Sequence, residues 1–161
     1  MAVDMFMKID GVKGEAKDSA HADEIDVLSW NWGLSQSGSR QTGGGGGSGK
    51  VNVQDIHFVK YVDKATTDLM LFCCNGKHIA SAQLTVRKAG ENPLEYLIIK
   101  MTDCLVTSHA GGGSHGDDRL VETVSLNFAK AEVDYTPQKE DGSGDAKMTM
   151  GWDIAKNEKA S

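Results

Sequence analysis

Apolar and polar residues alternate with a period of two along most of the chain, and this pattern predicts a mainly β fold. Met5 and Met7 alternate with Phe6 and Lys8 in a first strand, which a turn after Asp10 closes. The same alternation predicts further strands at 51–53, 56–61, 80–88, 95–108, 124–135 and 148–154. Apolar residues lie on both faces of 95–108, so we expect that strand to be covered on two sides.

The alternation changes phase at two places, and each change predicts a bend. Ile25 and Val27 share one face of a strand, but the two tryptophans that follow share the opposite face. Because side chains alternate strictly across a strand, we expect a bulge or sharp bend near Val27-Leu28. A second break near Ala129-Lys130 leaves 124–135 as either two strands or one bent strand.

One segment has helical spacing and predicts the chain's one convincing helix, at about 64–74. Asp63 suits the N-cap and Asn75-Gly76 supplies a left-handed C-cap. The apolar positions that form its buried face are Ala65, Leu69, Phe72 and Cys73. Strands with one helix, separated by glycine turns, predict a closed barrel or a sandwich. The phase breaks favour the closed barrel, because bulges let strands turn corners.

Length and composition predict a single domain spanning 1–161, without internal repeats or a linker. The chain ends soon after Trp152, so no C-terminal effector extension is expected. No run approaches the roughly 20 apolar residues of a spanning helix, so membrane insertion is not expected. The first residues lack a basic region and a long apolar stretch, which predicts no cleaved signal peptide.

Charge and cysteine usage narrow the function classes. The net charge is −6, with 17 basic residues scattered among 23 acidic ones, so nucleic-acid binding is not expected. Cys73, Cys74 and Cys104 offer no zinc-binding spacing and are interpreted as buried reduced thiols. Reduced thiols indicate folding in the cytoplasm.

A glycine-rich segment invites comparison with a phosphate-binding loop and fails it. Residues 44–50 match G-x-x-x-x-G-K, but Val51 stands where the motif requires a Ser or Thr that holds Mg²⁺. The residues that follow alternate like a strand, whereas a phosphate loop opens a helix. We therefore expect no nucleotide or other cofactor, and interpret the glycines as a long connection that adopts positive φ values.

The sequence shows no positive evidence for an enzyme. His109 and His115 lie in a predicted glycine-rich loop at 108–116 and are interpreted as exposed loop histidines rather than metal ligands. Ser108 and Ser114 lack the strand–turn–helix context of a nucleophile elbow. A catalytic group assembled only in space stays open as an alternative, and so does a hydrolase that uses these histidines.

The three tryptophans, Trp30, Trp32 and Trp152, are predicted to anchor the core. If they point inward, Ser29 and Asn31 point outward on a smooth polar surface. That surface is either ordinary solvent-facing sheet or the wall of something wide and wet. Exposed tryptophans would instead indicate a sugar-binding platform.

Several segments, found in the same order, carry a family resemblance that runs nearly end to end. They are MAVDMFMKIDGVKGEAKD, EIDVLSWNWGLSQSGS, GGGGGSGKVNVQDI, KAGENPLEYLIIK, DDRLVETVSLNFAKAEVDYTPQ and GWDIAKN. They resemble the haemolysin-coregulated protein (Hcp) family, the inner-tube subunit of the bacterial type VI secretion system. The vicinal Cys73-Cys74 pair and His109 and His115 depart from the pattern of this family.

The resemblance implies a small closed β-barrel of two antiparallel sheets with one flanking helix. It implies a homohexameric ring that stacks into a hollow tube, with a spike at the tip, a contractile sheath outside and effectors in the lumen. The protein would assemble in the bacterial cytoplasm and then be secreted without a cleaved leader. A ring needs one surface to meet a different surface of the next subunit.

Two sets of residues are candidates for contacts in such an assembly. Ser29 and Asn31 suit the lumen or its cargo. A protruding arm at about 38–53 is predicted to contact the adjacent ring or subunit through Gly43, Gly44, Gly45, Gly46, Gly47, Ser48, Gly49, Lys50 and Val51. The alternative to a tube subunit is a monomeric ligand-binding β-barrel or lectin.

Overall fold

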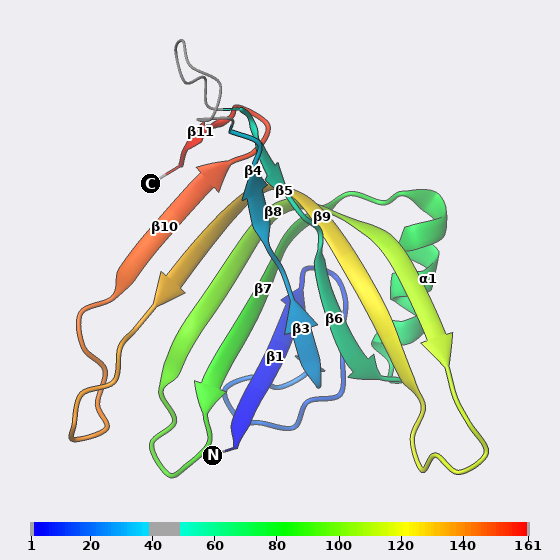
Figure 1. Ribbon diagram of the computed structural model, residues 1–161. Coiled ribbons are helices and arrows are strands. Elements are labelled where there is room, and N and C mark those ends of the chain that lie inside the picture. Colours follow the sequence, from blue (N-terminus) through cyan, green and yellow to red (C-terminus); the bar gives the residue numbers. More distant parts are fainter. Residues whose placement is uncertain (1, 39–48, 161) are drawn as a thin grey trace.

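The computed structural model describes residues 2–38 and 49–160, which form a mainly β protein with one helix (Figure 1). The helix α1 spans Ala65–Asn75. The strands are β1 Val3–Ile9, β2 Ile25–Asp26, β3 Ser29–Asn31, β4 Leu34–Gln36, β5 Val51–Val53, β6 Ile56–Tyr61, β7 Ile79–Lys88, β8 Glu95–Gly112, β9 Val121–Tyr135, β10 Met148–Asp153 and β11 Glu158–Lys159.

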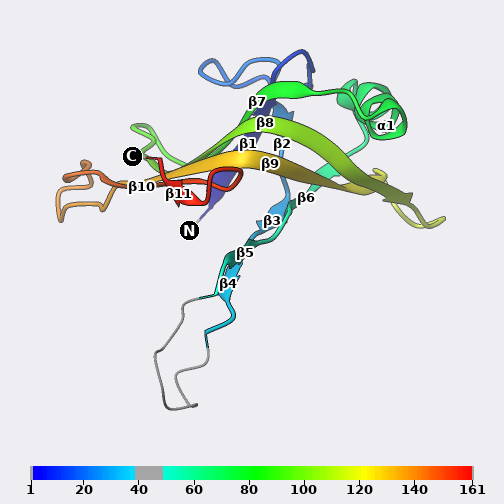
Figure 2. The ribbon, with the colours of Figure 1, turned by 90° about the horizontal axis from the view of Figure 1, so that it is seen from above.

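One antiparallel sheet contains nearly all of these strands. Its order is β11-β10-β9-β8-β7-β1-β2, and β6 adds to β9 while β3 adds to β6. The strands β4 and β5 pair only with each other and form a separate ribbon. Seen from above, α1 and the loop between β1 and β2 lie on one side of the sheet, and the ribbon projects from the opposite side (Figure 2).

The strand ladders do not form the closed barrel expected from the sequence. Strand β2 pairs with β1 and β3 pairs with β6, but β2 and β3 do not pair with each other. Only the corner between them reaches both edges, through hydrogen bonds from Val27 N to Met5 O (3.0 Å) and from Leu28 N to Val59 O (2.8 Å). The predicted bend at Val27-Leu28 is thus confirmed, and the strands that flank it pair with two different edges of the sheet.

Strand β9 is one bent strand, which decides between the two alternatives left by its phase break. One edge of β9 pairs with β8 along nearly its whole length. The other edge is divided between β6, which takes Val121 to Leu126, and β10, which takes Lys130 to Tyr135. The predicted break near Ala129-Lys130 is confirmed, because it lies where the sheet forks.

The buried side chains change parity along one line that crosses three neighbouring strands. On one side of this line the buried, mutually paired residues are Ile79, Cys104 and Phe128, and on the other side they are Ala82, Met101 and Ala131. Asp103, between them on β8, has a left-handed φ of 56°. Both groups belong to one hydrophobic core. The odd-numbered and even-numbered positions of a strand therefore face this core on different sides of the line. The expected cover on both sides of β8 is wrong for most of the strand, since Lys100, Thr102 and Leu105 are exposed.

Helix α1 has the expected C-cap, but its N-cap position is Lys64, which makes no side-chain cap hydrogen bond, and Asp63 supplies the capping side chain from one residue earlier. Asp63 Oδ1 accepts a hydrogen bond from Ala65 N (2.9 Å), and Thr66 Oγ1 accepts one from Asp63 N (3.0 Å). Gly76 ends the helix with a left-handed φ of 63°. Ala65, Leu69 and Phe72 are buried as predicted.

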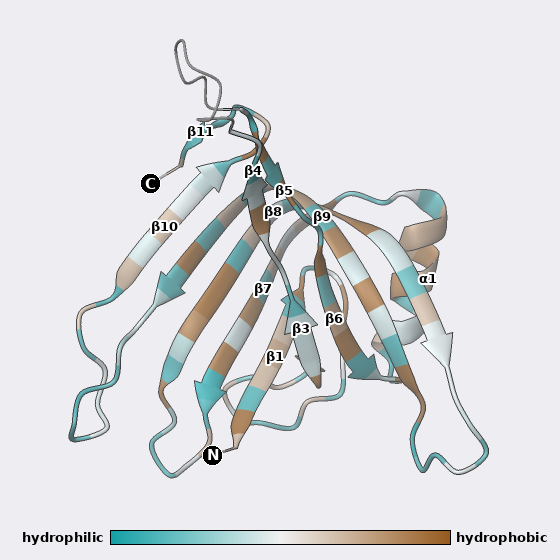
Figure 3. Cartoon of the chain, in the orientation of Figure 1, coloured by the Kyte–Doolittle hydropathy of each residue, from teal (hydrophilic) through white to brown (hydrophobic). Residues whose placement is uncertain are grey.

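The core lies between the sheet, the helix and the loop that follows β1, and apolar residues alternate with polar ones along the strands (Figure 3). Trp30 and Trp32 pack against this core. Trp32 lies 5.9 Å from Phe128, ring centroid to ring centroid, and donates a hydrogen bond to Gln54 O (2.8 Å). Trp152 is half-buried beside the β4–β5 ribbon instead of in the core. No helix in the described part of the chain is long and apolar enough to cross a membrane.

The predicted glycine-rich loop at 108–116 is partly strand. Residues Ser108 to Gly112 continue β8, and Gly112 pairs with Val121. Backbone groups make this ladder, so glycines extend it without side chains. The exposed connection is shorter and starts at Gly113.

The three cysteines are free thiols in three different environments, so the prediction that all are buried is correct only for Cys104. Cys73 is half-buried and Cys74 is exposed. Burial raises the pKa of the Cys104 thiol to about 11.

We expect one fast thiol in the native protein. Cys74 should react with a thiol reagent at pH 8, whereas Cys104 should react about a hundredfold more slowly, because it is buried and little of it is thiolate. Absorbance-monitored titration of native and unfolded protein measures this. The Cys74→Ser variant is the control, and a fast phase that survives in it would contradict the assignment.

Candidate functional site

The two histidines that depart from the family pattern do not come together as a metal site. His109 lies on β8, and its Nε2 is 2.9 Å from Glu122 Oε2, whereas His115 is exposed in the connection to β9. His109 is therefore not the exposed loop histidine that the sequence indicated. In residues 2–38 and 49–160, no three His, Cys, Asp or Glu side chains are placed to hold a metal ion. Ser108 contacts Ser125, and no histidine is recorded in contact with it.

A buried ionic cluster joins β6, β9 and the first turn of the helix. Lys60, with a fully buried side chain, donates to Glu122 Oε1 (2.5 Å) and lies 2.8 Å from Asp63 Oδ1. Thr66 Oγ1 also donates to Glu122 (2.7 Å). Burial by itself would raise the pKa of Glu122, but the hydrogen bonds from Lys60 and Thr66 and the nearby positive charge together lower it below the usual value of 4.5.

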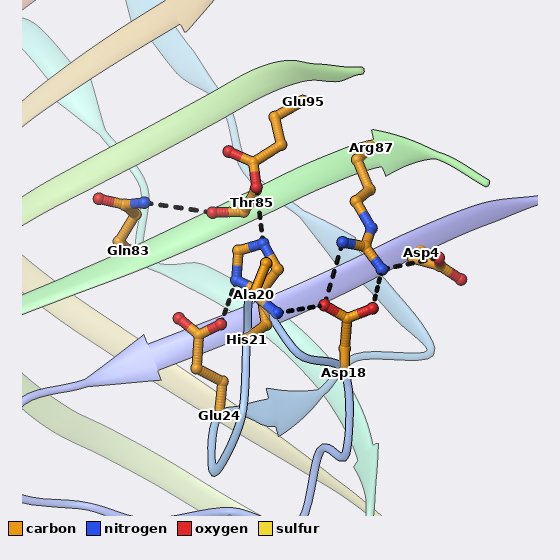
Figure 4. Close-up of polar contacts among 9 residues, drawn as sticks. All are labelled: Asp4, Asp18, Ala20, His21, Glu24, Gln83, Thr85, Arg87 and Glu95. Carbon is orange, nitrogen blue, oxygen red and sulfur yellow. Dashed lines mark hydrogen bonds and ion pairs between the residues drawn. The ribbon is translucent and has the colours of Figure 1, made fainter. Parts of the chain in front are cut away.

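A second polar cluster clamps the loop after β1 onto the sheet (Figure 4). The buried His21 ring stacks on Phe6 with centroids 4.4 Å apart, and its two nitrogens face Glu24 and Glu95. Arg87 on β7 donates to Asp18 (3.1 Å from Nη1 to Oδ1) and to Asp4 (3.3 Å). The hydrogen bond to Asp18 is the largest cause of a raised pKa of Arg87, and the bond to Asp4 adds to it. The hydrogen bond from Arg87 in turn lowers the pKa of Asp18.

The structure describes only the base of the arm that was expected at about 38–53. Residues Gly43 to Ser48 lie outside the described part of the chain, whereas Gly49, Lys50 and Val51 lie within it. Gly49 approaches the other side of the arm so closely that an added Cβ would lie 2.7 Å from Ser37 O. A glycine is therefore required at this position, and it carries the arm directly into β5.

The β4–β5 ribbon has one apolar and one polar face. Leu34 pairs with Val53 and Gln36 with Val51, so these four side chains share a face, while Ser35 and Asn52 share the other. The first face borders a groove of about 300 Å³ whose far side is formed by Met150, Trp152 and Asn157. The groove stays partly open to solvent, because Leu34 is 45% exposed and Met150 is 41% exposed.

The polar strand positions proposed for a lumen are exposed as expected. Ser29 and Asn31 flank the half-buried Trp30 on β3. Because Trp30 and Trp32 pack against the core, they do not form a flat exposed platform of the kind a sugar ring stacks on.

The partners of most charged residues in these clusters could not be predicted from the sequence. Lys60 and Glu122 are 62 positions apart, and Arg87 and Asp18 are 69 apart. The sequence offers one signal of a buried charge. Lys60 occupies a position of the alternating pattern that Ile56 and Phe58 fill with apolar side chains. Its partner cannot be named without the strand order.

The chain is similar to proteins of one family by both sequence and structure. Residues 6–135 match the family described as "Type VI secretion system effector, Hcp". Protein hcp1 of Pseudomonas aeruginosa is 60% identical over 162 aligned positions, covering 99% of this chain and 100% of that protein.

Solved structures agree. Hcp1 from Salmonella typhimurium has a TM-score of 0.79 at 38% identity, covering 99% of each chain. A structure described as a type six secretion system protein has a TM-score of 0.93 at 27% identity, covering 98% of this chain and 99% of that one.

Proposed function

The chain belongs to the Hcp family of type VI secretion system proteins, and on that premise we propose that it is the repeating subunit of a hollow tube. Six copies form a ring, and rings stack into a tube that sheath contraction expels together with a spike at its tip. The role is mechanical and includes no enzymatic step. The subunit assembles in the bacterial cytoplasm and is then secreted.

The observation that supports the ring is that apolar side chains are exposed at two opposite ends of the molecule, on β10 and on α1 (Figure 1). Met148 and Met150 are 65% and 41% exposed on β10, at one side of the sheet in Figure 1. Met70 and Leu71 are 48% and 55% exposed on α1, at the other side. When one such surface meets the other on the next copy, the contact is heterologous and closes into a ring after a fixed rotation.

The remaining contacts of the tube follow from the polar strand and the arm. We assign Ser29 and Asn31 to the lumen, where small polar side chains give a wall that binds cargo effectors without narrow specificity. We assign the arm, including Gly49, Lys50 and Val51, to the contact with the adjacent ring. In the assembled ring, the edges that meet at Val27-Leu28 would act as one continuous wall.

Mass measurement in solution together with negative-stain microscopy tests the ring. We expect a mass of six subunits and a central hole. Replacing both Met70 and Leu71 by Ser should leave a folded monomer, while Thr67→Ala, at another exposed position of the same helix, should leave the ring intact. A wild-type protein that stays monomeric at high concentration would contradict the proposal.

A further inference from the structure

We propose that Asp55 is a positioning residue which, with Thr107, fixes the direction in which the arm leaves the sheet. The β4–β5 ribbon at the base of the arm then meets a second copy of the chain in a fixed direction. This inference rests on the proposed function for its purpose, but the geometry of the arm is measurable in a single subunit.

One carboxylate joins the base of the arm to two strands of the large sheet. Asp55 lies between β5, which belongs to the arm, and β6, which belongs to the sheet. Its Oδ2 accepts a hydrogen bond from Thr107 on β8 (2.7 Å), and its Oδ1 accepts one from Asn127 on β9 (2.9 Å). Both bonds are strengthened by the charge of the carboxylate, and they hold it in one orientation.

The partner on β8 is presented by an irregularity in the ladder. The register between β8 and β9 shifts between Val106 and Ser108, which leaves Thr107 as the extra residue. A bulge turns a side chain in a new direction, and here the Thr107 hydroxyl contacts both Asp55 and Ser125 Oγ (2.8 Å). The bulge therefore places the Thr107 hydroxyl where it can donate to Asp55 at the base of the arm.

The other strand of the arm is fastened as well. Trp32 Nε1 donates to Gln54 O (2.8 Å), and Gln54 N donates to Gly33 O (3.0 Å). Because Trp32 packs against the core, this bond ties the base of the arm to the hydrophobic core. A surface held in its binding geometry loses less conformational entropy on association, which favours contact between rings.

Distance measurement between spin labels tests the inference directly. Labels at Asn52 on the arm and Lys100 on the sheet, in a Cys73→Ser and Cys74→Ser background, are diluted with unlabelled protein so that only distances within one subunit are read. We expect a narrow distribution that Asp55→Ala broadens about twofold without changing the thermal midpoint by more than a few degrees. Asp118→Ala, at an exposed position on the connection between β8 and β9, should leave it unchanged.

A paired exchange separates positioning from general damage. Asp55→Asn alone keeps an acceptor for Asn127 but turns its amide NH2 toward Thr107, which donates to Oδ2 in the native protein, and it should broaden the distribution. Asp55→Asn combined with Asn127→Asp reverses the donor and acceptor between these two positions and should narrow it again. A distribution that stays narrow in Asp55→Ala, or that the paired exchange does not narrow, would overturn the inference. Absence of rings in the wild-type protein would overturn the proposed function and leave this distance result standing.

Discussion

Deleting Gly43–Ser48 from the arm is expected to abolish ring stacking while the subunit stays folded and the ring stays closed. The hydrophobic core is formed by residues of the two described ranges, 2–38 and 49–160, and a change in the length of a connection alters stability only slightly. In the proposed tube the arm spans the gap to the next ring, and the deletion removes that reach. Negative-stain microscopy should show single rings in place of tubes, and the thermal midpoint should be unchanged.

Two matched variants make the trimming experiment specific. Replacing the five glycines Gly43–Gly47 by serine preserves the reach of the arm and should preserve tubes. Shortening the exposed polar turn at 139–144 removes a similar length elsewhere and should also preserve them. Tubes of normal length from the trimmed protein, or normal secretion of it, would mean that the arm is only a spacer.

Glu122→Gln is expected to lower the free energy of unfolding by about 3 kcal/mol, the lower end of the range for breaking a buried ion pair. The change leaves the buried Lys60 ammonium without its nearest carboxylate. The loss stays at the low end because Asp63 still lies 2.8 Å from Lys60. Denaturant unfolding measures it. Glu91→Gln, at an exposed position, should change stability by less than about 0.5 kcal/mol.

The difference between wild type and Glu122→Gln should depend on pH in a defined direction. The pKa of Glu122 is lowered in the folded protein from the usual 4.5. Its contribution is therefore fully present above pH 4.5 and is lost as the pH falls through the folded value. The two unfolding free energies should converge on acidification below pH 4.5. A difference that stays constant to pH 3 would show that the carboxylate charge does not stabilise the fold.

The local predictions that succeeded are those that depend on neighbouring residues. The capping residues of α1 and its buried face were predicted because capping bonds span three residues or fewer. Both phase breaks were predicted because alternation is a property of the chain alone. What each break does was not predictable. The break at Val27-Leu28 passes the chain from the β1 edge to the β6 edge, and the one near Ala129 marks the fork between β6 and β10.

The predictions that failed each required knowledge of a distant partner. Apolar residues of both parities on β8 indicated two covered faces, but the line of parity change shared with β7 and β9 turns both sets toward one core. His109 was interpreted as an exposed loop histidine because glycines surround it, and only the ladder to β9 places it against Glu122. The closed barrel is not confirmed, because β2 pairs with β1 and β3 with β6, and no ladder joins β2 to β3 in the described part of the chain.

The sequence by itself determined the β class, the helix and its caps, the position of the arm and, through its resemblance to a family, the secretion system to which the protein belongs. These follow from local periodicity and from segments that recur in order. Only the tertiary structure decided which charged residues are buried in pairs, how the base of the arm is held, and which apolar side chains remain exposed on opposite sides of the sheet. Those features join residues dozens of positions apart, and a pattern along the chain carries no information on which of its strands lie side by side.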